Sequence, residues 1–175
     1  MNGTVRILGI DPGSRVTGYG FIEQRGGRVA HLLSGCIRAE GDDLPQRLGS
    51  IFTALDELVA AYQPHQVAVE RVFVQRNVDS ALKLGQARGA AICAVVRHGL
   101  PVHEYTPAEI KKALVGRGAA AKEQVQHMVK TLLGHPRPLS ADAADALACA
   151  LCHNNIRQTL AHLPGVSGRR AGRWR

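Results

Sequence analysis

The chain has 175 residues, enough for one domain with a substantial core, and 45% of them are hydrophobic. Lysine and arginine outnumber aspartate and glutamate by 22 to 14, and the net charge of +8 favours a polyanionic partner over an acidic one. No apolar stretch is long enough for a membrane span and no signal peptide is visible, so we expect a cytoplasmic protein whose four cysteines are free thiols.

The N-terminal residues predict two strands joined by a tight turn. Residues 5–10 form an apolar run, Asp11 follows directly, Pro12-Gly13 supplies the turn, and residues 16–22 predict the second strand. Asp11 should therefore lie at the carboxyl end of a central strand, where ligands collect in open α/β sheets. The alternative is that Asp-Pro-Gly is only a hairpin turn.

The next elements place a second carboxylate beside the first. Residues 29–37 predict a third strand, which completes an antiparallel meander, and residues 44–62 have the apolar spacing of an amphipathic helix. A short strand over residues 65–70 then ends on Glu70. A helix between two strands indicates parallel pairing, so Glu70 should emerge at the same edge of the sheet as Asp11.

A loop and a long helix follow Glu70. In the loop, Phe73 lies between Arg71 and Arg76. An exposed aromatic ring between cations suits stacking on unpaired bases, although a phenylalanine folded back into the core is the alternative. The helix predicted over residues 77–97 is rich in glycine and alanine, which permit close packing on the sheet or on a second copy of the chain.

The following segment is basic. Residues 101–105 predict a fifth strand, and Thr106-Pro107 is a strong helix start. Four cations without an intervening acid surround the glycine-containing loop at residues 116–118: Lys111, Lys112, Arg117 and Lys122. They favour phosphate contacts, and a solvated turn is the alternative. Another helix is expected over residues 121–133.

The last predicted helix opens with two more carboxylates, Asp142 and Asp145, on one face near its N-terminus. Helix capping and the helix dipole would explain them without a function. Alanines surround both acids, however, which favours carboxylates held at a packed site with a cation. Beyond Leu163 glycine, proline and arginine dominate, so we predict a folded domain over residues 1–163 and a basic flexible tail over residues 164–175.

The pair Cys149 and Cys152, followed by His153, matches the C-x-x-C-H pattern of haem attachment, and a C-x-x-C pair can also form half of a zinc site. Haem attachment of this type requires export, and no second cysteine pair completes a zinc tetrahedron. We therefore interpret the pair as part of an apolar helix face.

The carboxylates predicted at strand ends and on the last helix, Asp11, Glu70, Asp142 and Asp145, would together form an oxygen-only cluster. Such ligands select Mg²⁺, with Mn²⁺ as a substitute, over zinc. Two such ions about 4 Å apart can activate a water molecule and stabilise the leaving oxygen of a phosphodiester. Beside a basic surface, the cluster predicts a metal-dependent nuclease acting on DNA or RNA.

Three segments resemble the RuvC family of bacterial Holliday-junction resolvases. They read ILGIDPGSRVTGYG near the N-terminus, DSALKLGQARG at residues 79–89 and ADAADALA at residues 141–148. The resemblance implies an RNase H-like α/β fold, with an antiparallel meander followed by parallel strands in a five-stranded mixed sheet and with helices on both faces. It also implies a homodimer formed through the helix that begins near Asn77.

The resemblance further implies roles for individual residues. Asp11, Glu70, Asp142 and Asp145 match the family's catalytic ligands for two Mg²⁺ ions, although some members have histidine in place of Asp142. Phe73 matches an aromatic residue that stacks on bases, and Lys111 and Lys122 match phosphate-binding lysines. Arg76, Lys112 and Arg117 are added as DNA-binding candidates because of their charge.

The implied function is the resolution of four-way junction DNA by symmetric paired nicking, in recombination and DNA repair near the bacterial nucleoid, together with the RuvA and RuvB branch-migration complex. Two alternatives differ from it. The segment from Gly9 to Gly13 also resembles the first phosphate-binding hairpin of actin and sugar-kinase type ATPases, although those proteins need two such domains. The other alternative is a junction-binding protein of the same fold that does not cut.

Overall fold

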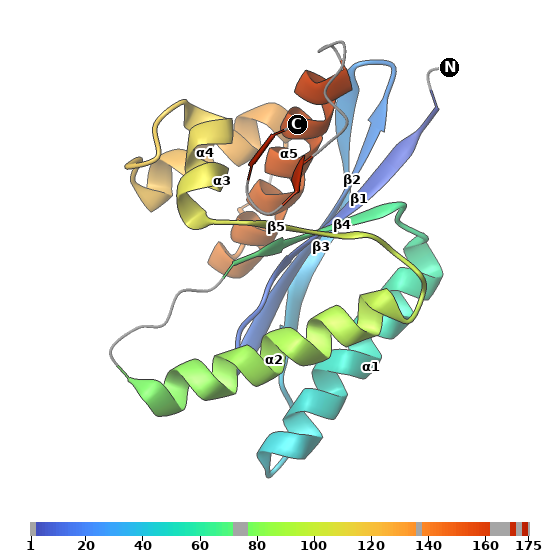
Figure 1. Cartoon of the computed structure of the whole chain (residues 1–175), viewed down its shortest axis with the longest axis vertical. Coiled ribbons are helices and arrows are strands. Elements are labelled where there is room, and N and C mark those ends of the chain that lie inside the picture. Colours follow the sequence, from blue (N-terminus) through green and yellow to red (C-terminus); the bar gives the residue numbers. More distant parts are fainter. Residues whose placement is uncertain (1–2, 72–76, 136–137, 162–168, 171–172, 175) are drawn as a thin grey trace.

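The computed structural model describes residues 3–71, 77–135, 138–161, 169–170 and 173–174. A five-stranded sheet with the order β3-β2-β1-β4-β5 forms its centre (Figure 1). The strands β1 (Val5–Asp11), β2 (Val16–Arg25) and β3 (Arg28–Arg38) form an antiparallel meander. The strands β4 (Gln66–Glu70) and β5 (Val102–Tyr105) then add in parallel, which confirms the predicted mixed sheet.

Helices cover both faces of the sheet (Figure 1). The helices α1 (Leu44–Tyr62) and α2 (Val78–Val96) lie on one face, and α3 (Pro107–Val115), α4 (Lys122–Leu133) and α5 (Ala141–Ala161) lie on the other. Successive strand residues point to opposite faces. Ile7 accordingly belongs to the core under α3, α4 and α5, whereas Leu8 belongs to the core under α1 and α2.

Side-chain caps start three of these helices. The side chains of Asp43 and Asn77 accept hydrogen bonds from the backbone N–H groups of Gln46 and Ser80, so α1 and α2 each begin one residue later. Thr106 and Glu109 form a reciprocal capping box at the start of α3. The structure therefore confirms the helix predicted over residues 77–97, except that Asn77 and Arg97 are its N-cap and C-cap.

His153 of α5 forms hydrogen bonds to residues of β4 and β5. Its Nδ1 lies 2.6 Å from the Tyr105 hydroxyl, and its Nε2 lies 2.9 Å from Oε1 of Gln66. Burial, together with the charges of His103 and Arg157, lowers the pKa of His153 to about 3. The ring is neutral at physiological pH, and it accepts from the tyrosine on one nitrogen and donates to the glutamine from the other.

The remaining features concern the cysteines and the C-terminal residues. Cys149 and Cys152 are buried free thiols on α5, as predicted. Near the C-terminus, the two-residue strands β6 (Arg169–Arg170) and β7 (Arg173–Trp174) pair antiparallel, and a flexible tail over residues 164–175 stays a prediction. No helix in the described part of the chain combines the length and apolarity needed to cross a membrane.

Candidate active site

Two of the predicted carboxylates end neighbouring parallel strands. Asp11 is the last residue of β1, and Glu70 is the last residue of β4. The parallel register pairs Ile10 with Val69, so the two acids leave the sheet side by side. Their side chains are joined by a hydrogen bond. The predicted meeting of Asp11 and Glu70 at one edge of the sheet is therefore observed.

Helix α5 brings the other two carboxylates over this edge, and glycine makes its close approach possible. A Cβ atom at Gly9 of β1 would overlap the carbonyl oxygen of Ala146, and one at Gly18 of β2 would overlap the carbonyl oxygen of Asp142. The backbone of α5 consequently packs directly on the backbone of these strands. The first turns of α5, with Asp142 and Asp145, thus lie next to the end of β1.

A pocket of about 320 Å³ opens at this place. Three carboxylates and two lysines contribute to its wall: Asp11, Glu70, Asp145, Lys111 and Lys122. Apolar side chains from α3, α4 and α5 complete the lining, namely Pro107, Ile110, Val125 and Ala148. Asp142 does not line the pocket, but its charge lies close enough to raise the pKa of Asp11.

The crowding of acids changes their protonation. Burial, followed by the charges of Glu70 and Asp145, raises the pKa of Asp11 from 3.8 to about 8. Burial also raises the pKa of Glu70, while the hydrogen bond from Asp11 opposes that change. At neutral pH Asp11 therefore keeps its proton and donates a hydrogen bond to Glu70.

The pocket lysines compensate the remaining negative charge. Lys122, the first residue of α4, places its Nζ 2.5 Å from Oδ2 of Asp145. This hydrogen bond is the main reason why the pKa of Lys122 is raised. Lys111 lies on α3, and its charge acts on Glu70 by lowering that carboxyl's pKa. Acidic and basic side chains thus face one another in the pocket.

The donor set fits a hard divalent cation, because the acids offer only oxygen ligands and repel each other without positive charge. In the described part of the chain, however, no three His, Cys, Asp or Glu side chains are grouped closely enough to hold a metal ion. Lys122 is the cation that pairs with Asp145 here. A metal ion bound in this pocket would require the acids to lie closer together than they do in this structure.

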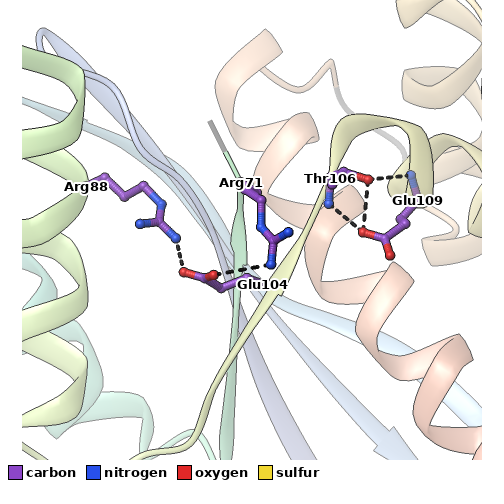
Figure 2. A network of polar contacts seen from close by, with 5 residues as sticks. All are labelled: Arg71, Arg88, Glu104, Thr106 and Glu109. Carbon is purple, nitrogen blue, oxygen red and sulfur yellow. Dashed lines mark hydrogen bonds and ion pairs between the residues drawn. The ribbon is translucent and has the colours of Figure 1, made fainter. Parts of the chain in front are cut away.

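Two of the other predicted contact residues, Lys112 and Arg117, do not line the pocket. Lys112 and Arg117 are exposed, at the end of α3 and in the loop after it. Phe73 and Arg76 fall outside the described residues, so their predicted DNA contacts stay predictions. The structure adds a feature that sequence patterns did not indicate: Glu104 of β5 is paired with both Arg71 and Arg88 (Figure 2). No spacing rule relates these three positions.

Comparison with known proteins identifies the family. The profile of the family described as "Crossover junction endodeoxyribonuclease RuvC" matches residues 7–153. A protein of this name from Methylococcus capsulatus is 58% identical over 158 residues, which cover 90% of this chain and 95% of that protein. The chain belongs to the RuvC family. Another member, from Tolumonas auensis, is 55% identical over 170 residues, covering 97% of this chain and 98% of its own length.

Solved structures agree with the family assignment. RuvC of Thermus thermophilus is 35% identical, with a TM-score of 0.80, and the match covers 89% of this chain and 96% of that one. The same protein in complex with a Holliday junction substrate gives a TM-score of 0.83 at the same identity and coverage. The yeast mitochondrial Holliday junction resolvase Ydc2 shares the RNase H-like fold, with a TM-score of 0.68 at 15% identity. Family membership sets aside the ATPase alternative.

Proposed function

We propose that this chain is a divalent-metal-dependent endonuclease that resolves four-way DNA junctions. The observation that carries the proposal is the pocket in which Asp11, Glu70 and Asp145 face Lys111 and Lys122. The comparisons support the proposal in two ways. The chain belongs to a family named for cutting crossover junctions, and the structure of one family member is known in complex with a Holliday junction substrate.

Within this proposal, each of the four acids and each pocket lysine has a role. Asp11, Glu70, Asp142 and Asp145 would hold two Mg²⁺ ions, or Mn²⁺ in their place. Such ions would supply an activated water molecule and stabilisation of the leaving oxygen of the phosphodiester. Lys111 and Lys122 bind the phosphate on either side of the cut, since both reach the pocket from helices that flank it. The apolar wall around Ile110 limits the water that reaches the reacting phosphate.

Residues around the pocket extend the DNA contact. The exposed Lys112 and Arg117 bind backbone phosphates farther along the arms, where such contacts position the DNA without reading its sequence. Phe73 stacks on a base at the opened crossover, and Arg76 binds beside it. Together these contacts favour a branched substrate over a straight duplex.

The proposed enzyme is a homodimer formed through α2. Val78, Leu82 and Val96 of this helix are 68%, 63% and 52% exposed. Gly85 and Gly89 lie at helical spacing between them, with open space where a side chain would be. A second copy packed on this stripe would bury it, and the resulting twofold symmetry suits paired, symmetric nicks in a four-way junction. We also propose that the enzyme acts together with RuvA and RuvB in bacterial recombination and repair.

The deciding experiment compares cleavage of a synthetic four-way junction with cleavage of a linear duplex, in Mg²⁺ and in chelator. Wild type should cut the junction only with metal. Asp11→Asn and Asp145→Asn should cut it about 1000-fold more slowly, because a metal site contributes several kcal/mol to such a reaction. Both variants should still bind the junction with a Kd near that of wild type.

The control is Glu57→Gln, which neutralises an exposed acid of α1 on the opposite face of the sheet and should cut normally. Asp11→Asn with wild-type activity would refute the catalytic assignment. A wild-type protein that binds junctions in Mg²⁺ and never cuts them would be the non-catalytic alternative.

A further inference from the structure

The carboxylate of Glu104 is shared by two arginines from different elements (Figure 2). Arg88 of α2 binds Oε1 through its Nη2, and Arg71 places its Nη2 3.7 Å from Oε2. Each arginine uses its own oxygen, so both are bound at the same time. The side chains of Arg88, Glu104 and Arg71 are 22%, 36% and 49% exposed, and Arg88 is thus the most enclosed of the three.

Arg71 connects this network to Glu70, its neighbour in the chain. The backbone N–H of Arg71 donates to the carbonyl oxygen of Tyr105 at 2.7 Å. The strand register pairs Val69 with Glu104 and Glu70 with Tyr105. The chain on both sides of Glu70 is therefore fixed to β5, and the ion pair between Arg71 and Glu104 adds a side-chain contact just after the catalytic candidate.

Arg88 connects the same carboxylate to α2. Its Nε atom is buried and has no hydrogen-bond partner among the described residues. A partly buried guanidinium needs a compensating negative charge, and Glu104 supplies it. Loss of Glu104 would therefore remove the negative charge that compensates the guanidinium of Arg88 against the sheet.

The residues next to Glu104 contact the other elements of the pocket. Tyr105 bonds His153 of α5, the helix that carries Asp142 and Asp145. Thr106 caps α3, the helix that carries Lys111. The end of β5 therefore adjoins each of these parts of the pocket, and the ion pair between Glu104 and Arg88 connects α2 to this point.

We propose that Glu104 is a positioning residue that couples α2 to Glu70 through Arg88 and Arg71, so that the placement of α2 helps to set the placement of the Glu70 carboxylate. This inference rests on the proposed function in one respect, the role of Glu70 as a metal ligand. Under this inference a correctly placed α2 orders the pocket, and this effect does not depend on whether the same helix also holds two copies together.

The test is Glu104→Gln, which keeps the side-chain shape and removes the charge. Mn²⁺ binding without DNA, followed by calorimetry, should weaken about 10-fold, within the range of typical coupling between sites. On a four-way junction, kcat should fall by a similar factor while KM stays near that of wild type. The matched control is Asp56→Asn, because Asp56 of α1 also holds two basic groups, Arg97 and His98, at the far end of α2.

Asp56→Asn should leave the Kd for Mn²⁺ and kcat unchanged, even if its melting temperature falls as much as that of Glu104→Gln. Arg88→Met provides an independent variant should Glu104→Gln fold poorly, and it should reproduce the loss of Mn²⁺ affinity. The double variant Glu104→Gln/Arg88→Met should lose less Mn²⁺ affinity than the product of the two single losses, because both substitutions break the same ion pair.

Wild-type Mn²⁺ affinity and wild-type kcat in both Glu104→Gln and Arg88→Met would overturn the inference. An equal loss in Asp56→Asn would also overturn it, since the effect would then follow from stability alone. If wild type failed to cut junctions, the proposed function would fail while the Mn²⁺ measurement would still decide the role of Glu104.

Discussion

Lys122 and Asp145 form the ion pair of the pocket that a bound metal would affect most directly. The ammonium group of Lys122 pairs with Asp145, whose side chain is only 20% exposed. We infer that a divalent cation held by Asp145 would compete with Lys122, and a lysine released in this way could bind phosphate. Lysine suits this exchange because its flexible stem carries a compact charge that can move between partners.

This exchange predicts that Lys122→Met binds Mn²⁺ more tightly than wild type in the absence of DNA. The gain should be about 3- to 5-fold, because an ion pair with a half-exposed partner is worth up to about 1 kcal/mol. Titration calorimetry measures it, and cleavage should fall in the same variant. Lys111→Met is the control: Lys111 lines the same pocket and acts on Glu70, whereas Lys122 is the lysine ion-paired with Asp145, so removal of Lys111 should change Mn²⁺ affinity less. Equal gains in both variants would show that only net charge matters.

At the scale of elements, the contact of α5 with the sheet depends on Gly9. The Cβ of an alanine there would overlap the carbonyl oxygen of Ala146 and crowd the backbone nitrogen of Ala150. Gly9→Ala should therefore lower the free energy of unfolding by about 3 kcal/mol or more, as overpacking against backbone does at its upper end. Urea unfolding measures this change.

The control for Gly9→Ala is Gly49→Ala, at an exposed position inside α1, where an added Cβ meets nothing within 4 Å. It should raise the free energy of unfolding by about 0.8 kcal/mol, the difference in helix propensity between the two residues. If both variants unfolded at the same urea concentration, α5 would not depend on the bare backbone at Gly9.

The elements also show how far sequence patterns reach. Apolar runs that end on Asp11 and Glu70, with a crossover helix between them, were enough to predict that both acids share one edge of the sheet. The alanines around Asp142 and Asp145 correctly indicated a packed helix face. These inferences use local spacing and the geometry of parallel strands, which a sequence records directly.

Other features depend on contacts that no local pattern encodes. The ion pair between Lys122 and Asp145 requires α4 to pack against α5, and the sharing of Glu104 requires α2 to lie beside β5. The sequence indicated Lys122 as a phosphate ligand and gave no sign of Glu104. Long-range side-chain partners follow from tertiary packing, so they became visible only in the folded chain.

Over the whole molecule, the two faces of the sheet have different tasks. The face covered by α3, α4 and α5 carries both pocket lysines and Asp145, while α1 and α2 cover the other face. The exposed apolar stripe lies on the second face, along α2. The proposed dimer surface and the proposed metal site would thus lie on opposite faces of the sheet, and the ion pair between Glu104 of β5 and Arg88 of α2 would connect them.

This separation predicts that Leu82→Arg produces a folded monomer. Leu82 is 63% exposed, so the substitution should change the stability of one subunit by no more than about 0.5 kcal/mol. In a dimer it would bury two unpaired charges at the centre of the stripe, which is strongly unfavourable. Sedimentation velocity should show a dimer for wild type and a monomer for the variant, with unchanged circular dichroism. On a four-way junction, the variant should make single nicks in place of paired cuts.

The matched control for the monomer prediction is Leu132→Arg, since Leu132 is an apolar side chain of α4 that is 45% exposed on the opposite face of the sheet. It should sediment as wild type does, because a charge there meets no second copy. A Leu82→Arg protein that remained dimeric would place the interface elsewhere. A Leu132→Arg protein that became monomeric would also place the interface elsewhere. The face that carries the pocket would then hold the two copies together and would not be free to bind DNA.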